Sequence, residues 1–252
     1  MQVFESLLQV KIEKGGGFFL LLDPDRTTPD MILMLAEAAE DSEVDAVLVG
    51  TSLMTKNNFQ TTVKDVRERT SLPVIIFPGT HSQISPNADA ILFTSLISGR
   101  NPTYLIDEQV KGAPLVKEYG IEPIATGYML IESGGYSSVQ YISHSMPIPS
   151  DKNDIACAHA LAAQYMGMQA IFMEAGSGAR QSVPLSMIES VAEYINLPII
   201  VGGGIREPRE VESKIKAGAS FVVVGHHFEN NNDLKALHEF AEAAHPLAAV
   251  AL

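Results

Sequence analysis

The sequence has no tryptophan, one cysteine and few basic residues for its length. Because Cys157 is the only cysteine among 252 residues, no disulfide can form within the chain, and a reducing, cytoplasmic setting is expected. Lys and Arg total 17 against 30 Asp and Glu, which gives a formal net charge of −13. This shortage of cations argues against nucleic-acid binding, since phosphate backbones are neutralised by Lys and Arg.

Long apolar runs are also missing. No stretch approaches the roughly 18 uninterrupted apolar residues of a membrane span. The opening residues, MQVFESLLQVKIEK, carry charges at amphipathic spacing, which predicts a short helix and not a secretory signal. The negative charge also repels anionic ligands at long range. A bound phosphate ester would therefore need local devices, such as backbone N–H groups, helix N-termini or a divalent cation.

Short apolar segments alternate with helical patterns along the whole chain. Several of these segments are apolar without alternation, as strands covered on both faces are. The expected strands are 18–23, 46–50, 73–77, 90–93, 123–130, 170–174, 198–203 and 220–225. The expected helices are 29–41, 56–69, 104–119, 152–167, 183–195, 207–217 and 231–244. Eight such units predict a single (β/α)8 barrel domain over residues 1–252, with a doubly wound open sheet as the alternative.

The longest irregular segment is ESGGYSSVQYISHSMPIPS, residues 132–150. A loop of this length inside a compact domain is usually functional or disordered. Its two Tyr and two Ile residues favour an ordered loop.

Polar residues and glycines collect directly after the expected strands, where the active site of a (β/α)8 barrel lies. A single glycine pair often serves turn geometry alone. Glycine turns after strands 7 and 8 together predict a phosphate site, because backbone N–H groups can converge there. The residues at these ends are Asp23, Asp25, Thr51, Ser52, Glu174, Gly176, Ser177, Gly178, Gly202, Gly203, Gly204, Arg206, Gly225, His226 and His227.

Two carboxylates stand out at these strand ends. Asp23 follows an apolar run directly and could hold Mg²⁺. The alternative is a helix cap, but Thr27 and Thr28 are better placed for it; whether Asp25 assists the metal stays open. Burying Glu174 without a partner would be costly, and the flexible residues after it suit close approach of a ligand.

The histidines give little further signal. No metal-ligand spacing links His81, His144, His159, His238 and His245, so ordinary polar positions are expected. A zinc pair at His226 and His227 is not expected, because adjacent residues on a turn point apart. No Gly-x-Ser-x-Gly elbow or Cys/His pair suggests covalent catalysis.

An ordered set of segments covers nearly the whole chain and resembles the geranylgeranylglyceryl phosphate synthases. This prenyltransferase family includes the bacterial heptaprenylglyceryl phosphate synthases, and the resemblance is to its longer-sequence branch. The segments are LLDPD, VGTS, FTSLISGRNP, GGYSSVQYIS, FMEAGSG, VGGGIR and VVGHHFEN. The resemblance implies a Mg²⁺-dependent barrel that joins the 3-hydroxyl of sn-glycerol 1-phosphate to a polyprenyl diphosphate, expected to be geranylgeranyl diphosphate. Diphosphate is released and an ether bond forms.

The resemblance also implies roles for individual residues. Asp23 and Ser52 match the Mg²⁺ positions, and Glu174 would be the base that deprotonates the attacking hydroxyl. The glycerol phosphate positions are Phe172, Met173, Glu174, Ala175, Gly176, Ser177, Gly178, Gly203, Gly204, Gly225 and His226. Arg100 is expected to contact the diphosphate, with the prenyl tail near Tyr104, Tyr128 and Tyr136. This chain departs from the family at Phe172, where Tyr is usual, and at His226, where Asn or a small polar residue is expected.

Other features stay open at this stage. A homo-oligomer, either a dimer or a hexamer, and transient membrane contact are expected. The preferred prenyl length depends on groove depth, which the sequence does not give. One alternative is an isomerase or lyase that acts on a small sugar phosphate with Glu174 as base, without Mg²⁺ or an apolar groove. Another is a catalytically silent barrel that binds lipids or metabolites.

Overall fold

Eight parallel strands close into a barrel in the computed structural model, which describes residues 2–229 and 234–247. The strands follow chain order around the barrel, and β1 pairs with β8 in parallel register, Phe19 opposite Val223. This closure confirms the predicted (β/α)8 barrel over an open sheet. The strands are β1 Gly17–Leu22, β2 Ala46–Val49, β3 Val74–Ile76, β4 Ala90–Leu96, β5 Glu122–Leu130, β6 Ala170–Glu174, β7 Ile199–Gly202 and β8 Phe221–Val224.

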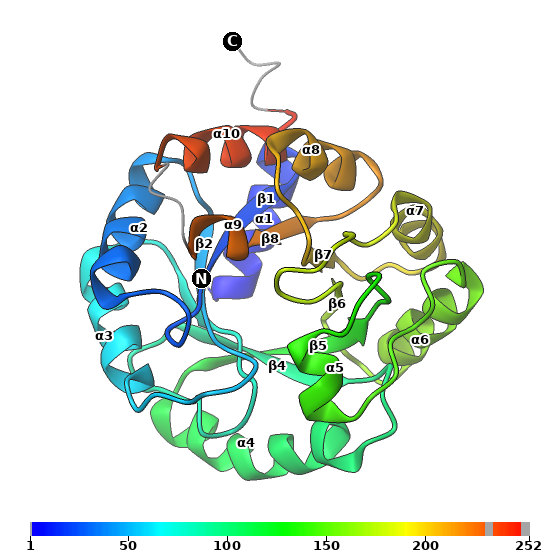
Figure 1. The fold of residues 1–252 in the computed structure, drawn as a ribbon, viewed down its shortest axis with the longest axis horizontal. Coiled ribbons are helices and arrows are strands. Elements are labelled where there is room, and N and C mark those ends of the chain that lie inside the picture. The colour runs from blue at the N-terminus through cyan, green and yellow to red at the C-terminus, as the bar shows by residue number, and fades with distance from the viewer. Residues whose placement is uncertain (1, 230–233, 248–252) are drawn as a thin grey trace.

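A ring of helices surrounds the strands (Figure 1). Helix α2 illustrates how the sequence sets an element: the Thr28 side chain accepts a hydrogen bond from the N–H of Met31, and Pro29 occupies the first helical turn, as capping rules favour. The outer helices are α2 Pro29–Asp41, α3 Phe59–Arg69, α4 Glu108–Tyr119, α6 Asn153–Tyr165, α7 Leu185–Tyr194, α8 Pro208–Lys216 and α10 Leu234–Ala244. A π-helical turn, η1 Thr103–Asp107, precedes α4. Residues 231–233 of the predicted last helix lie outside the described residues.

The predicted N-terminal helix is present as α1 Val3–Lys14, and it closes the N-terminal end of the barrel. Phe4 and Leu7 are buried in the same cluster as the inward-facing strand residues, such as Phe19. The Glu122 carboxylate at the start of β5 accepts hydrogen bonds from the N–H groups of Val3 and Phe4, at 2.5 and 3.2 Å. Ligands therefore meet the barrel at its other end.

A buried ionic cluster ties the two ends of the chain together at this closed end. The Asp45 carboxylate accepts hydrogen bonds from the Phe18 N–H at 2.8 Å and from His245 Nε2 at 2.7 Å, and it pairs with Lys14 at 2.8 Å. His245 is only 2% exposed. His245, for which no ligand role was expected, is a structural residue.

The long 132–150 segment is ordered and partly helical. Helix α5, Ser138–Ser143, begins after Ser137, whose side chain accepts a hydrogen bond from the Gln140 N–H. This segment packs on the loop after β6, because a Cβ on Gly176 would stand 2.5 Å from the Ser137 Cβ. The segment thus lies over the open end of the barrel, as does the short helix α9, His226–Glu229 (Figure 1).

None of the helices in the described ranges combines the length and apolar character needed to cross a bilayer.

Candidate active site

A cavity of about 160 Å³ lies at the C-terminal end of the barrel strands and opens to solvent. It is formed by the loops after most strands, which a closed parallel barrel brings to one rim. The sequence-predicted residues that line it are Asp23, Ser52, Glu174, Ser177, Gly178, Gly203, Gly204, Gly225 and His226.

The remaining residues of the predicted glycerol phosphate segment do not line this cavity. Phe172 points into the barrel below it, fully buried and stacked on Phe77 with ring centroids 4.8 Å apart. The side chains of Met173 and Ala175 pack in the outer cluster with the helices. Strand alternation explains this pattern, since residues 172 and 174 face inward while 173 and 175 face outward.

Arg100, the predicted diphosphate contact, lies apart from the cavity. Its guanidinium donates to the carbonyl of Gly99 at 2.7 Å and lies 3.5 Å from His159 Nε2. The residue is exposed and does not line the cavity.

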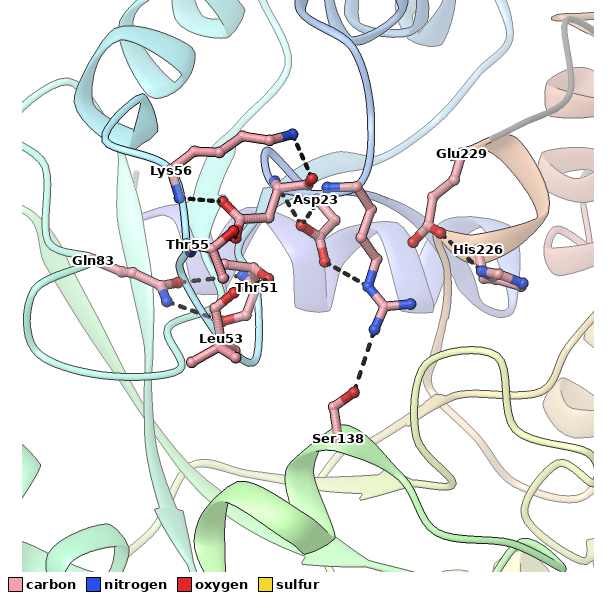
Figure 2. A network of polar contacts seen from close by, with 11 residues as sticks. Asp23, Thr51, Leu53, Thr55, Lys56, Gln83, Ser138, His226 and Glu229 are labelled. Carbon is pink, nitrogen blue, oxygen red and sulfur yellow. Dashed lines mark hydrogen bonds and ion pairs between the residues drawn. The ribbon is translucent and has the colours of Figure 1, made fainter.

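Asp23 sits at the end of β1, buried at the cavity wall (Figure 2). One carboxylate oxygen accepts the N–H groups of Asp25 and Arg26 at 2.9 and 3.3 Å, and the Arg26 Nε lies 3.5 Å from the other. Burial raises the pKa of Asp23, and the negative charge of Glu229 adds to this rise, while bonds from the Asp25 amide and the Thr51 hydroxyl oppose it. Negative charge is thus concentrated at this wall.

Asp25 serves a different purpose from Asp23. Its carboxylate accepts hydrogen bonds from the hydroxyl of Thr55 at 2.7 Å and from the N–H of Lys56 at 3.2 Å. These bonds join the loop after β1 to the loop after β2 (Figure 2). Asp25 does not line the cavity. Its carboxylate instead links two of the loops at the rim of the barrel.

The protein donors available for a metal are few. No cluster of three or more His, Cys, Asp or Glu residues suited to a metal occurs within residues 2–229 and 234–247. Asp23 and Ser52 face the cavity together, and a hard divalent cation of the Mg²⁺ type often takes only one or two carboxylates, with water and substrate phosphate oxygens completing its shell. The concentrated negative charge at Asp23 fits such a cation.

Glu174 ends β6 as a buried carboxylate surrounded by peptide backbone. Burial raises its pKa to about 7, while the hydrogen bond from the Gly176 N–H, 2.6 Å long, opposes this rise. A Cβ on Gly203 would stand 2.2 Å from Glu174 Oε1, and the backbone there has φ +84°. Only glycine fits at that position, so the glycines beside Glu174 permit the close approach of two loops.

Tyr128, on the neighbouring strand β5, brings a hydroxyl close to this carboxylate. It is the register partner of Phe172, it lines the cavity and it is 6% exposed. Burial raises the pKa of Tyr128 well above its usual value, and the charge of Glu174 contributes. The two groups therefore lie within electrostatic reach of one another.

Apolar and aromatic side chains from β4, β5, η1, α5 and the segment after β3 form one part of the cavity lining, the apolar arm. Tyr104 and Tyr128, which were expected near a prenyl tail, both line it. Tyr136 does not, since it is 89% exposed on the 132–150 segment. Further apolar side chains in this lining are Phe77, Ile84, Ile91, Phe93, Leu96, Val139 and Ile142.

Comparisons with known proteins match this geometry. The family model described as the PcrB family matches residues 8–244. The chain belongs to the PcrB family. It is 43% identical over 249 residues to geranylgeranylglyceryl phosphate synthase of Chitinophaga pinensis, covering 99% of this chain and 98% of the relative. It is 42% identical over 232 residues to the enzyme of the same name from Pyrococcus furiosus, covering 92% of each.

A solved structure agrees in shape as well as in sequence. (S)-3-O-geranylgeranylglyceryl phosphate synthase from Thermoplasma acidophilum, crystallised with its substrate sn-glycerol-1-phosphate, superposes with a TM-score of 0.92 and 34% identity. The match covers 97% of this chain and 99% of that one. The predicted resemblance is confirmed, and the protein is a prenyltransferase of this family. The comparisons do not favour the isomerase or lyase alternative.

Sequence reasoning did not find Glu229. Its side chain is 6% exposed, it lines the cavity, and it pairs with His226. The signal was present in the spacing of HHFE, because residues three apart meet on one side of a helical turn.

Proposed function

We propose that the protein joins the 3-hydroxyl of sn-glycerol 1-phosphate to a polyprenyl diphosphate, expected to be geranylgeranyl diphosphate, with release of diphosphate. One observation carries this proposal: a single cavity is lined by the apolar arm, by the buried Glu174 carboxylate and by the glycine turns after β7 and β8. The names of the relatives support the same reaction. An apolar arm suits a prenyl chain and has no use in a sugar-phosphate isomerase.

The phosphate of the glycerol substrate would lie at the glycine turns after β7 and β8. Gly203 and Gly204 have positive φ angles of +84° and +71°, so side chains are absent where backbone amides approach the ligand. An adjoining pocket is shared by Gly178, Gly204 and His226. Neutral peptide N–H groups can bind an anion here despite the negative charge of the chain.

Gly203→Ala is expected to raise the KM for sn-glycerol 1-phosphate by about 10-fold or more and to lower kcat. Its Cβ would stand 2.2 Å from the Glu174 carboxylate and 2.6 Å from the Gly176 N, so either the turn or the carboxylate must move, and small displacements of this kind cost about 100-fold in rate. Steady-state kinetics with varied sn-glycerol 1-phosphate measures both constants.

Gly167→Ala is the matched control for this variant. Gly167 has a similar φ of +81°, but no atom lies within 4 Å of its added Cβ. Gly167→Ala introduces similar backbone strain but no steric clash, so its KM for sn-glycerol 1-phosphate should stay at the wild-type value. Equal KM values for both variants would move the phosphate site away from Gly203.

Glu174 is the proposed general base. A carboxyl with a pKa of about 7 can accept the proton of the 3-hydroxyl as oxygen attacks the allylic carbon, and its charge stabilises the positive character of that carbon. The proton stays on the carboxylate until solvent removes it. The Tyr128 hydroxyl beside it would supply the hydrogen bond that Phe172, lacking a hydroxyl, does not offer.

Mg²⁺ is the proposed cofactor, held by Asp23 and Ser52 together with the diphosphate of the substrate. When bound, it would neutralise charge on the leaving diphosphate. Asp23 is oriented for this role by the two backbone N–H groups that bind one of its oxygens.

The decisive experiment is incubation with sn-glycerol 1-phosphate, Mg²⁺ and prenyl diphosphates of several lengths, followed by product mass. We expect an ether product whose mass identifies the preferred chain, and none with sn-glycerol 3-phosphate as the matched control. Release of diphosphate without ether product would contradict the proposal.

The remaining expectations concern the setting of the enzyme. We infer a cytoplasmic homo-oligomer, a dimer or a hexamer, that contacts membranes transiently to exchange its apolar substrate and product. Light scattering after size exclusion measures the assembly, and co-sedimentation with lipid vesicles measures the contact.

A further inference from the structure

The side chains of His226 and Glu229 lie within hydrogen-bond distance of one another at the mouth of the barrel. His226 Nδ1 lies 2.8 Å from Glu229 Oε2 (Figure 2). The Glu229 side chain is 6% exposed, whereas that of His226 is 50% exposed. Both residues line the main cavity. A carboxylate this deeply buried holds its partner in a fixed direction, so the imidazole ring is oriented.

The face of the imidazole packs on the glycine loop after β6. A Cβ on Gly178 would stand 3.6 to 3.7 Å from His226 Cε1, Nε2 and Cδ2. The same ring lines the adjoining pocket with Gly178 and Gly204. With Nδ1 engaged by Glu229 and the ring face on Gly178, Nε2 is the ring nitrogen left to contact a ligand in these pockets.

The charges around the cavity make this ring important. Four carboxylates line it, those of Asp23, Glu108, Glu174 and Glu229, and no Lys or Arg is among its lining residues in the part of the chain that the structure describes. Arg206 borders the adjoining pocket, but its guanidinium donates to the carbonyl of Ala179 at 2.7 Å. Of the described residues that line both the main cavity and the adjoining pocket, only His226 has a side chain that can carry a positive charge.

We propose that Glu229 positions the His226 imidazole as a charged clamp on the phosphate of the glycerol phosphate substrate. This inference rests on the proposed function. In the complex with the substrate, Nδ1–H donates to Glu229 and Nε2–H donates to a phosphate oxygen. Charge-assisted hydrogen bonds of this kind are stronger than neutral ones. The clamp replaces the amide or small polar residue expected at position 226 with a cation.

Substitution of Glu229 separates two effects of opposite sign. If Glu229 acted only through its charge, Glu229→Gln would remove a repulsive carboxylate and tighten phosphate binding. Because Glu229 orients His226 in this proposal, Glu229→Gln should instead weaken the binding of sn-glycerol 1-phosphate and raise its Kd about 3- to 10-fold. His226→Ala removes the donor and should raise the Kd for sn-glycerol 1-phosphate about 10- to 100-fold.

The test is calorimetric titration of sn-glycerol 1-phosphate into the full chain, with both single variants and the double variant. We expect the double variant to bind no more weakly than His226→Ala, because Glu229 acts through the ring. His238→Asn and Glu239→Gln, on the exposed side of α10, are the matched controls and should keep the wild-type Kd. Additive losses, or tighter binding by Glu229→Gln, would overturn the proposal.

A second readout excludes a merely structural role for the pair. In protein with ¹⁵N-labelled histidine, the Nε2 resonance of His226 should move to the protonated position when sn-glycerol 1-phosphate binds, and this movement should be lost in Glu229→Gln. An Nε2 resonance that does not respond would overturn the clamp.

Inorganic phosphate distinguishes failure of the clamp from failure of the proposed function. If the wild type binds inorganic phosphate but not sn-glycerol 1-phosphate, and His226→Ala weakens phosphate binding, the clamp stands and the proposed substrate falls. If sn-glycerol 1-phosphate binds equally well to both, the substrate stands and the clamp falls.

Discussion

Glu174→Gln is expected to lower kcat about 10²- to 10⁴-fold and to leave the fold intact. Glutamine keeps the size of the side chain and can still accept the Gly176 N–H bond, but it cannot take the proton of the substrate hydroxyl. Single-turnover measurement of ether product gives the chemical step directly. Glu189→Gln, at an exposed position on α7, is the control, and equal rates in the two variants would remove Glu174 from the base role.

The pKa of Glu174 also predicts how activity depends on pH. A base works in its deprotonated form, so kcat should rise as pH increases through about 7, the value to which burial raises this pKa. Below that pH the carboxyl is protonated and turnover falls. A pH profile of kcat in the wild type measures this inflection, which should be absent from the residual rate of Glu174→Gln.

The same group should reduce the stability of the fold at high pH. Its pKa is raised from 4.5 when unfolded to about 7 when folded, so the cost of the buried charge is absent below about pH 4.5 and complete above about pH 7. This difference corresponds to roughly 3 kcal/mol. Glu174→Gln should therefore be the more stable protein at pH 8 and lose that advantage at pH 5, as urea unfolding at the two pH values would measure.

Asp23→Asn is expected to lower Mg²⁺-dependent turnover by at least about 100-fold, because metal stabilisation of a leaving group contributes several kcal/mol. The asparagine oxygen can still accept the Asp25 and Arg26 N–H groups, so the turn after β1 should persist. The substitution removes the negative charge of Asp23. It therefore removes the proposed anionic ligand of the metal and also the repulsion between Asp23 and Glu229. Turnover against Mg²⁺ concentration, and Mn²⁺ binding followed by electron paramagnetic resonance, measure the two consequences.

Asp25→Asn is the matched control for this variant. It weakens the bonds to Thr55 and Lys56 and should lower the melting temperature, but it should leave the Mg²⁺ dependence unchanged. If Asp23→Asn retained wild-type turnover, or if Asp25→Asn lost the metal response instead, the metal assignment would be wrong.

The barrel could be predicted because its strands are covered on both faces and read as solid apolar runs. The prediction was weakest where polar residues interrupt a strand. β4 continues from the predicted 90–93 through Thr94 and Ser95 to Leu96, and Ser95 satisfies its hydroxyl by donating to the Leu105 carbonyl at 2.7 Å. Helices α5 and α9 span few residues, so periodicity could not reveal them.

The position of the candidate site was predictable for a topological reason, whereas its side-chain directions were not. Residues directly after parallel strands must meet at one rim, which placed Asp23 and Glu174 together. The sequence left a metal role open for Asp25 and predicted a diphosphate contact for Arg100, but Asp25 is hydrogen-bonded to Thr55 and Arg100 to the Gly99 carbonyl, away from the cavity. Those contacts depend on the folded backbone.

The hydrogen bond between Asp45 and His245, 200 residues apart, has a consequence for biosynthesis. A nascent chain on the ribosome has made β1 long before β8 exists to pair with it, and loops of this length close slowly. The edge of β1 and the surface that α10 covers stay exposed until β8 and α10 have been translated. We therefore expect chaperones to stay bound to the nascent chain until His245 has been translated and the segment that contains His245 has emerged from the ribosomal exit tunnel.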